Sequence, residues 1–466
     1  MRVEATIGLA LAVVLPHPSS AQLKAPGEQA SRNMHVLSHI PVGRGPNKSG
    51  YQEILDVEIE QELSRPYAYV AHLRDKEGFD IISMKDPARA RMIYRWQIGN
   101  TELQPGLPSR SGAFNPRYFK LKGRYYVALC FQYPQGGPES NLGAIIFDVT
   151  GLPDTNQVKE AGRIYAKDTP SGFHNLFPYK HSDGRVLLFT TTTSPNANVY
   201  DLDKFLAKDP NQGFIGKIAG GPPTQSVYGI LRGYHDMYVA YDPASHQDRF
   251  YGAGYSGYFV YDVTRPEDPK LLTSITGAAG LEVAHTFQAT PDGRYGITQM
   301  EYQFAPLRVF DLKPGLDGTA KAISRPVGAW QAAPTGWKNA SHNHQIRWPY
   351  VFVASFDDGL QVLNIMDPTN PYTVGFWDTQ DAPDLQGLDL ATGLHGNTIF
   401  TGAWGVQVRN ADGLIVVSDF KTGFWALKMD GFDGWNGHQW GMPNISSAQD
   451  WDNGPDGAPK VQKVSE

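Results

Sequence analysis

Residues 341–379 read SHNHQIRWPYVFVASFDDGLQVLNIMDPTNPYTVGFWDT, and this stretch decides the fold. It contains four strand-like segments, HNHQIRW, YVFVAS, GLQVLNI and YTVGFWDT, with no helical periodicity between them. Pro349, Asp357–Gly359 and Asp367–Pro368 separate the segments, and turns require these residue types. Four short strands in succession are typical of one blade of a β-propeller.

The third of these segments recurs along the chain at intervals of about 50 to 65 residues. The copies are GFDIISMKDP near residue 80, GAIIFDVTGLPD near 145, NVYDLDKFLAKDP near 200, GYFVYDVTRPEDP near 260, PLRVFDLKPG near 310, GLQVLNIMDPTNP near 362 and GFWALKM near 426. An alternating apolar segment lies upstream of each copy. The repeat predicts an all-β, seven-bladed β-propeller with four-stranded antiparallel blades over residues 22–435. We expect one helical turn at most, at Leu202–Lys208.

The seventh blade lacks a clean fourth strand after GFWALKM. The segment MHVLSHIPVG, Met34–Gly43, has a suitable pattern and could supply the outer strand. Such an N-terminal strand would close the ring and remove an open sheet edge. The C-terminal tail, residues 436–466, is rich in Gly, Pro and Asp, and we expect it to wrap the surface or to be disordered.

The N-terminus has the pattern of a secretory signal peptide over residues 1–21. Arg2 precedes an apolar run, Ala5–Leu15, and small residues follow at Ser19–Ala21. The apolar run is too short for a transmembrane helix, and no later run is long enough. The sequence therefore predicts a secreted or periplasmic protein without a membrane span.

Charge and cysteine content exclude several classes of function. The formal net charge is −6 with no basic block, which gives no electrostatic basis for binding nucleic acid. Cys130 is the only cysteine, so an intrachain disulfide framework and a thiolate metal cluster are both excluded. It lies in the alternating segment YYVALCFQY, where we expect it to be buried. The partner that remains is a small-molecule or oligosaccharide substrate, and the oligomeric state stays open.

The repeat resembles that of the LVIVD-repeat propellers. GLQVLNIMDPTNP, GYFVYDVTRPEDP and GFDIISMKDP carry the resemblance, which covers most of the chain but only its structural positions. It implies an exported bacterial seven-bladed propeller and implies no particular activity.

Histidines recur at the predicted start of the innermost strand in blades three to seven. They occur in FHNLFPY, YHDMYVAYD, AHTFQAT, SHNHQIRW and LHGNTIFTG, as His174, His235, His285, His342 with His344, and His395. Equal positions in successive blades lie at equal radius and height, so we expect these imidazoles to converge near the axis. Because His342 and His344 are two residues apart, we expect both to face the same side of one strand.

Converging imidazoles without a thiolate suit copper, iron or zinc. Three or four such ligands with an open position would make a reactive centre. Nearby candidates for outer-shell groups are Asp236, Glu282, Asn175, Asn343 and Glu301. Two alternatives remain open: duplicated histidines that only bond a neighbouring blade, and acid–base use without metal. In the second, His174 or His235 would act with Tyr234, Arg232 or Arg117.

Three functions follow from these alternatives. The first is metal-dependent oxidation or oxygenation of a small organic substrate. FHNLF, YHDMY and LHG are similar to local motifs of the carotenoid-cleaving oxygenases, which hold iron on four axial histidines, but that family's flanking residues are absent. Selenium-binding-type thiol oxidases share the architecture, but their cysteine motifs are missing here. The second function is β-elimination on uronate-containing polysaccharide by His, Tyr and Arg, and the third is a secreted binding scaffold without catalysis.

Overall fold

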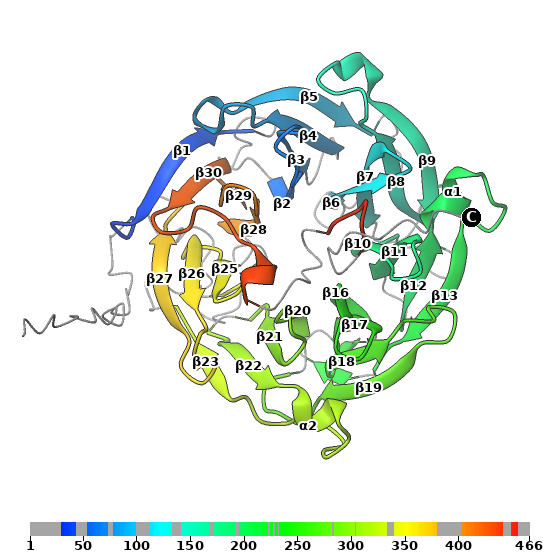
Figure 1. Cartoon of the computed structure of the whole chain (residues 1–466), viewed down its shortest axis with the longest axis vertical. Helices are drawn as coiled ribbons and strands as arrows, with labels where there is room; N and C mark the ends of the chain where they lie inside the picture. Colours follow the sequence, from blue (N-terminus) through cyan, green and yellow to red (C-terminus); the bar gives the residue numbers. More distant parts are fainter. Residues whose placement is uncertain are drawn as a thin grey trace, which may run out of the picture.

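The computed structural model is a ring of seven four-stranded antiparallel sheets around a central axis (Figure 1). The predicted all-β seven-bladed propeller is thus confirmed. The structure describes residues 29–42, 54–72, 78–98, 112–132, 141–166, 172–191, 195–221, 224–226, 229–231, 233–281, 284–302, 304–332, 340–379, 402–440 and 449–454. The predicted signal peptide lies outside these residues.

In blades one to six the four strands follow one another from the axis outward (Figure 1). Blade one contains β2 (Ile54–Ile59), β3 (Tyr67–His72), β4 (Gly78–Ser83) and β5 (Arg91–Gln97). Blade two contains β6 (Gly112–Leu121), β7 (Arg124–Gln132), β8 (Leu142–Asp148) and β9 (Lys159–Tyr165). Blade three contains β10 (Asn175–Lys180), β11 (Val186–Thr191), β12 (Asn196–Asp201) and β13 (Phe214–Ala219).

Blades four to six repeat this order. Blade four contains β16 (Tyr234–Asp242), β17 (Gln247–Gly254), β18 (Gly257–Asp262) and β19 (Lys270–Ile275). Blade five contains β20 (Ala284–Ala289), β21 (Tyr295–Met300), β22 (Leu307–Asp311) and β23 (Gly328–Trp330). Blade six, the stretch quoted first, contains β24 (His344–Arg347), β25 (Tyr350–Ala354), β26 (Leu360–Asn364) and β27 (Tyr372–Trp377).

The N-terminal strand closes the ring, as the sequence predicted. Blade seven contains β28 (Ala403–Val408), β29 (Ile415–Asp419) and β30 (Gly423–Met429), and its outer strand is β1 (Met34–Ile40). β1 pairs antiparallel with β30 from Met34 opposite Met429 to Ile40 opposite Phe424. Strands from the two ends of the propeller therefore share one sheet, and the seventh blade has no unpaired edge on β30.

Helical structure is minor in the described residues. It comprises α1 (Leu202–Leu206), α2 (Lys313–Leu316) and the 3-10 turns η1 (Pro87–Arg89), η3 (Thr155–Gln157) and η4 (Gly437–Trp440). α1, between β12 and β13 of blade three, confirms the turn expected at Leu202–Lys208, whereas α2 is a second turn that the sequence did not predict. A small hairpin, β14 (Thr224–Ser226) with β15 (Gly229–Leu231), precedes blade four. Within the described ranges no helix has the length and apolar character that crossing a bilayer needs.

In blades two to six an Asp or Asn ends the third strand, and this residue has a local structural function. Its side chain accepts a hydrogen bond from the amide two residues further on, which bends the chain into the loop before the fourth strand. These pairs are Asp148 with Thr150, Asp201 with Asp203, Asp262 with Thr264, Asp311 with Lys313, and Asn364 with Met366, at 2.8–3.0 Å. The repeat motif is therefore explained by turn formation and needs no chemistry.

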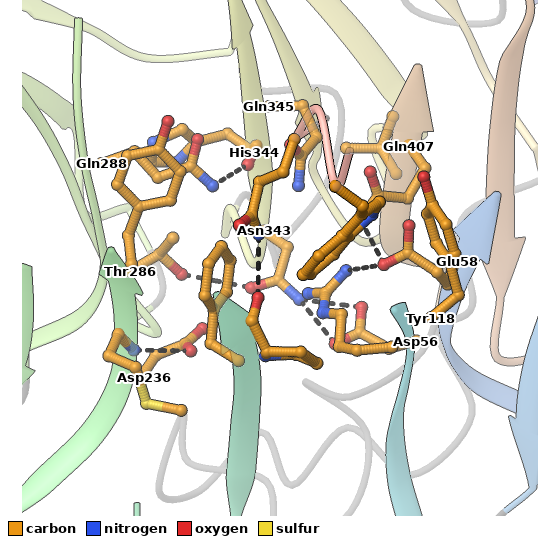
Figure 2. A pocket seen from close by; sticks show the side chains of 18 residues that line it. Asp56, Glu58, Tyr118, Asp236, Thr286, Gln288, Asn343, His344, Gln345 and Gln407 are labelled. Carbon is orange, nitrogen blue, oxygen red and sulfur yellow. Dashed lines mark hydrogen bonds and ion pairs between the residues drawn. The ribbon is translucent and has the colours of Figure 1, made fainter. Parts of the chain in front are cut away.

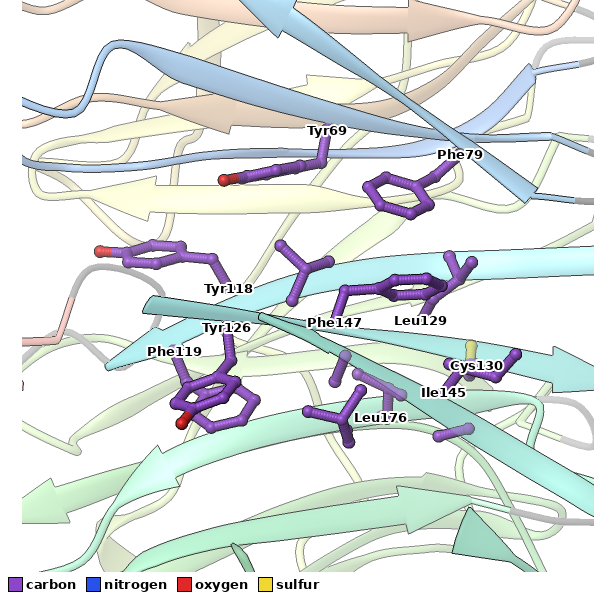
Figure 3. Packing of buried hydrophobic residues seen from close by; sticks show 14 of the residues in the cluster. Tyr69, Phe79, Tyr118, Phe119, Tyr126, Leu129, Cys130, Ile145, Phe147 and Leu176 are labelled. Atoms are coloured by element: carbon purple, nitrogen blue, oxygen red, sulfur yellow. The ribbon is translucent and has the colours of Figure 1, made fainter. Parts of the chain in front are cut away.

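Apolar side chains fill the space between neighbouring blades, and Figure 3 shows this packing between blades one, two and three. Phe147 of β8 lies between Phe79 and Trp96 of blade one, with ring centroids 4.8 Å from each. Cys130 is fully buried in the same cluster, as its alternating segment predicted. This packing fixes the blades against one another and so fixes the ends of the innermost strands around the axis.

Candidate metal centre

Four histidines from four successive blades lie side by side at one end of the innermost strands. We call them the axial histidine cluster: His174, His235, His285 and His342. Ring centroids are 4.1 Å apart for His174 and His235, 4.2 Å for His235 and His285, and 4.4 Å for His285 and His342. The convergence expected from the blade period is therefore found for four of the six predicted histidines.

Irregular pairing at the strand ends sets the direction of these side chains. The register between the first and second strands shifts at His235 and again at His285. Such a bulge adds one residue to a strand and redirects its side chain. His174 and His342 lie just before β10 and β24, where regular alternation has not yet begun. The four imidazoles therefore meet at the ends of the innermost strands, where side chains no longer alternate regularly between the two faces of the sheet.

Glu301, directly after β21, faces three of the histidines. Its carboxylate oxygens lie 4.0 Å from Nε2 of His235, 3.7 Å from Nε2 of His285 and 3.6 Å from Nε2 of His342. His235, His285 and Glu301 each offer one ligand atom, and these atoms lie within 4.8 Å of one another. Three imidazole nitrogens and one carboxylate thus converge, at separations longer than a hydrogen bond.

Backbone and amide acceptors fix the tautomer of two histidines. Nδ1 of His342 lies 2.7 Å from the carbonyl oxygen of Trp404. Nδ1 of His174 lies 2.5 Å from Oε1 of Gln132. Because a carbonyl oxygen only accepts, each Nδ1 carries the proton, and Nε2 of the neutral ring keeps its lone pair.

Thr286 fixes the tautomer of His285. Its hydroxyl donates its one proton to the carbonyl oxygen of His342 at 2.9 Å or to Oδ1 of Asn343 at 3.2 Å. Nδ1 of His285 lies 2.7 Å from the same hydroxyl oxygen and must therefore donate to it. Nε2 of His285 is left with a lone pair and has no hydrogen-bond partner within the described part of the chain.

Burial keeps the histidine rings neutral. It lowers the pKa of His174 to about 4 and that of His342 to about 3. Burial, together with the neighbouring histidines, holds the pKa values of His235 and His285 well below the ordinary 6.5. Neutral imidazole is the form that binds a metal ion, so these rings need lose no proton to act as ligands.

The carboxyl of Glu301 is largely buried and faces no cationic side chain among the described residues, so it would ionise readily only beside a bound cation. Burial raises the pKa of its carboxyl to about 8, and the charge of Asp236 adds to the rise. A tetrahedral ion with bonds of about 2.1 Å separates its ligand atoms by about 3.4 Å. The Glu301–histidine distances are slightly longer than this. A cation between them would need only small side-chain shifts and would offset the carboxylate charge.

Aromatic side chains from blades six and seven cover one side of the cluster. The His342 ring lies 4.4 Å from Trp404 and 5.1 Å from Phe356. Phe356 is fully buried and has a φ of +37°, a conformation costly for an aromatic residue. Its amide and carbonyl both bond Ala403, which holds it in place. This apolar wall shields His342 and so helps to keep the ring neutral.

A polar ring lies one residue further along the innermost strands. Asn115 donates to Asn175, and Asn175 donates to Asp236. On the other side of the axis, Asn343 donates to both carboxylate oxygens of Asp56 at 3.0 and 3.2 Å. Blade seven, which lies between Asn343 and Asp56 in the ring, contributes a glycine there, Gly405. A Cβ at this position would lie 2.4 Å from Oδ1 of Asp56.

Two predicted ligands have other positions. His344 begins β24 and lines a separate cavity further along the axis, with Nδ1 2.7 Å from Oε1 of Gln299. His342 lies two residues before His344, the first residue of β24, and the two rings occupy different heights along the axis: His342 lies beside Glu301 and His344 beside Gln299. The assignment of His395 to an innermost strand is wrong. β28 has that position, Trp404 lies where a histidine was expected, and His395 lies outside the described residues.

The predicted acid–base residues have mixed outcomes. Tyr234 packs against Phe250 and Phe259 inside blade four, and its hydroxyl donates to the carbonyl of Ala219. It has a core position, so we give it no part in the cluster. Arg232 and Glu282 lie outside the described residues. Arg117 lies in the axial cavity described below, where it pairs with Glu58 at 2.9 Å.

Sequence reasoning placed Glu301 among outer-shell candidates, whereas the structure puts it within reach of a shared ligand position. It did not find Gln132, Thr286, Trp404 or Phe356. Trp404 could have been found by aligning AWGVQV with the other innermost strands. No local signal identifies the remaining three, because only the packing of neighbouring blades brings them to the histidines.

No protein-family model matches the chain, and no curated protein matches it. The resemblance to LVIVD-repeat propellers therefore stays a prediction from the sequence. The function has to be argued from the cluster itself.

Proposed function

We propose that the axial histidine cluster binds one transition-metal ion and that the protein uses it to oxidise or oxygenate a small organic substrate. One observation carries the proposal: neutral imidazoles of His235, His285 and His342 direct Nε2 toward the carboxylate of Glu301. A merely structural histidine is normally satisfied at its buried nitrogen atoms. Here Nε2 of His285 has no hydrogen-bond partner among the described residues.

Copper, iron or zinc suits these ligands, and iron or copper would supply redox chemistry as well as a Lewis acid. The protein's own residues have separate roles. His235, His285 and His342, with Glu301, would hold the ion. Thr286 and the Trp404 carbonyl orient two of the rings through Nδ1. The remaining ligand, His174, lies at the edge of the cluster.

The other two functions receive less support from the geometry. A lyase mechanism with Tyr234 as base needs an accessible hydroxyl, whereas this one is bonded to Ala219 in the core. A scaffold without catalysis gives no reason for several buried imidazoles to share one carboxylate. We also propose that the protein is secreted or periplasmic, on the signal-like pattern of residues 1–21.

Metal content tests the proposal directly. Untagged protein, purified without chelators, should contain close to one equivalent of iron, copper or zinc by inductively coupled plasma mass spectrometry. The variant His235→Ala with His285→Ala should lose it. His35→Ala is a matched control, since that histidine lies half exposed on β1 and pairs with Asp430.

If the protein holds less than a tenth of an equivalent of every metal after reconstitution, the proposed metal centre is ruled out. Oxygen uptake with a panel of thiols, phenols and alkenes then tests the reaction. Uptake should require the loaded metal and be lost with His285→Ala. If the metal-loaded protein takes up no oxygen with any substrate, the oxidative function is overturned. A new absorbance at about 235 nm when the protein is incubated with uronate polysaccharide would favour the lyase.

A further inference from the structure

A polar cavity lies further along the innermost strands, where Asp56, Asp236 and Asn343 of the polar ring form part of its lining (Figure 2). Its volume is about 40 Å³. Gln449 and Trp451 of the C-terminal segment line one end of it. Gln449 is held there by the Lys180 amide and the Pro178 carbonyl, and the Trp451 ring packs edge-on against Tyr118. We call this space the axial cavity.

The axial cavity contains more negative than positive charge. Asp56, Glu58 and Asp236 line it, and each is more than nine-tenths buried. Arg117 is the one cationic side chain in the lining, and its Nη1 lies 2.9 Å from Glu58. When all four groups are ionised, the lining carries two uncompensated negative charges. Buried charges of this kind are costly unless something balances them.

The cavity also has acceptors that lack donors. Oε1 of Gln288, Oε1 of Gln345, Oε1 of Gln407 and Nε2 of His344 are buried and have no hydrogen-bond partner among the described residues. These side chains are 7, 5, 1 and 0% exposed. Figure 2 shows them around the same space. Buried acceptors in proteins are rarely left without a donor or a cation.

Hydrogen bonds at the other polar atoms of Gln288, Gln407 and His344 support this assignment of acceptors. Nε2 of Gln288 donates to the carbonyl of His344 at 2.6 Å, and Nε2 of Gln407 points to Glu58 at 3.5 Å. Nδ1 of His344 lies 2.7 Å from Oε1 of Gln299 and carries the proton, so its Nε2 accepts. In these three side chains the other polar atom is already bonded within the packed strands, and the unpartnered atom is the acceptor.

We propose that the axial cavity binds one hard cation, Ca²⁺, through carboxylate and amide oxygens. The candidate ligands are Asp56, Asp236, Gln288, Gln345 and Gln407. With Asp56, Glu58 and Asp236 ionised, a divalent ion would balance the two excess negative charges, and it would supply the missing partner for the amide oxygens. This inference does not rest on the proposed function of the axial histidine cluster.

Size and ligand type select this ion. A space of about 40 Å³ holds an ion with one or two waters, whereas an apolar molecule the size of benzene needs about 150 Å³. Ca²⁺ accepts six to eight oxygen ligands in flexible geometry, while Mg²⁺ demands a near-ideal octahedron and keeps its waters. The candidate oxygens come from five different blades, which suits the flexible coordination of Ca²⁺. The lining offers one imidazole and no thiolate, which disfavours a softer metal.

Equilibrium dialysis of the full-length protein against Ca²⁺, after treatment with EDTA, tests the proposal. The expected result is one Ca²⁺ per chain with a Kd at or below about 10⁻⁴ M. Asp56→Asn and Gln345→Leu should each weaken binding at least tenfold. Asp268→Asn removes the same charge from an exposed site and should bind as the unchanged protein does.

Less than a tenth of an equivalent of Ca²⁺ at 1 mM, or binding unaffected by both cavity variants, would overturn the proposal. So would occupancy by Na⁺ or Mg²⁺ at equal concentration in place of Ca²⁺. Dialysis of the unchanged protein tests the proposal even if a variant fails to fold. His285→Ala should keep its Ca²⁺ while losing transition metal, so failure of either site can be told from failure of the other.

Discussion

Replacing Thr286 by Val removes one hydroxyl that serves two histidines of the axial cluster. The hydroxyl accepts from Nδ1 of His285 at 2.7 Å and lies 2.9 Å from the carbonyl oxygen of His342. Val has nearly the same volume, so the packing changes little while His285 Nδ1–H is left without an acceptor. Loss of such an orienting partner costs about 10- to 100-fold in metal affinity. An unsatisfied buried donor costs about 1–3 kcal/mol in the free energy of unfolding.

Competition with a chromogenic chelator measures the affinity, and urea denaturation of the metal-free protein measures the stability. Thr298→Val is the matched control, because Thr298 is buried in the same blade and its hydroxyl donates to the Arg308 carbonyl. It should lose stability and keep its metal affinity. An affinity within threefold of the unchanged protein for Thr286→Val, or an equal loss in both variants, would refute the orienting role.

Three other predictions concern the fold and the cavity. Deletion of residues 1–41 removes β1 and should lower the free energy of unfolding by about 0.5–1.5 kcal/mol for each lost backbone bond; urea denaturation measures this, and a peptide of residues 29–42 should restore it. Arg95→Ala removes two 2.7 Å bonds to the fully buried Asp80 and should cost about 3 kcal/mol by the same measurement. Burial raises the pKa of Glu58 to about 7, so between about pH 4.5 and 7 the folded state keeps a proton that the unfolded state has lost. Proton binding to Glu58 therefore stabilises the folded state at low pH, and this contribution to the free energy of unfolding is lost as pH rises from about 4.5 to 7. Against the unchanged protein in EDTA, Glu58→Gln should abolish about 3 kcal/mol of that pH dependence, and identical slopes would contradict the assignment.

The cluster could be predicted from the sequence only in part. The period of the blades was sufficient to bring His174, His235, His285 and His342 together, because equal positions in equal repeats lie at equal heights. His344 could not be placed in this way. It lies two residues further along the chain than His342, and its side chain lines the axial cavity instead of joining the cluster.

The sequence by itself determined the number of blades, most of the strands within them and the closure of the ring by β1. Each depends on short patterns that recur along the chain: alternation, turn residues and the Asp or Asn that ends the third strand in blades two to six. Only the tertiary structure decided which groups share a site. Glu301 faces the histidines because β21 ends beside the neighbouring blades, and Gly405 admits Asp56 because blades one, six and seven meet at the axis. Such contacts join side chains from different strands and blades, and no local pattern encodes them.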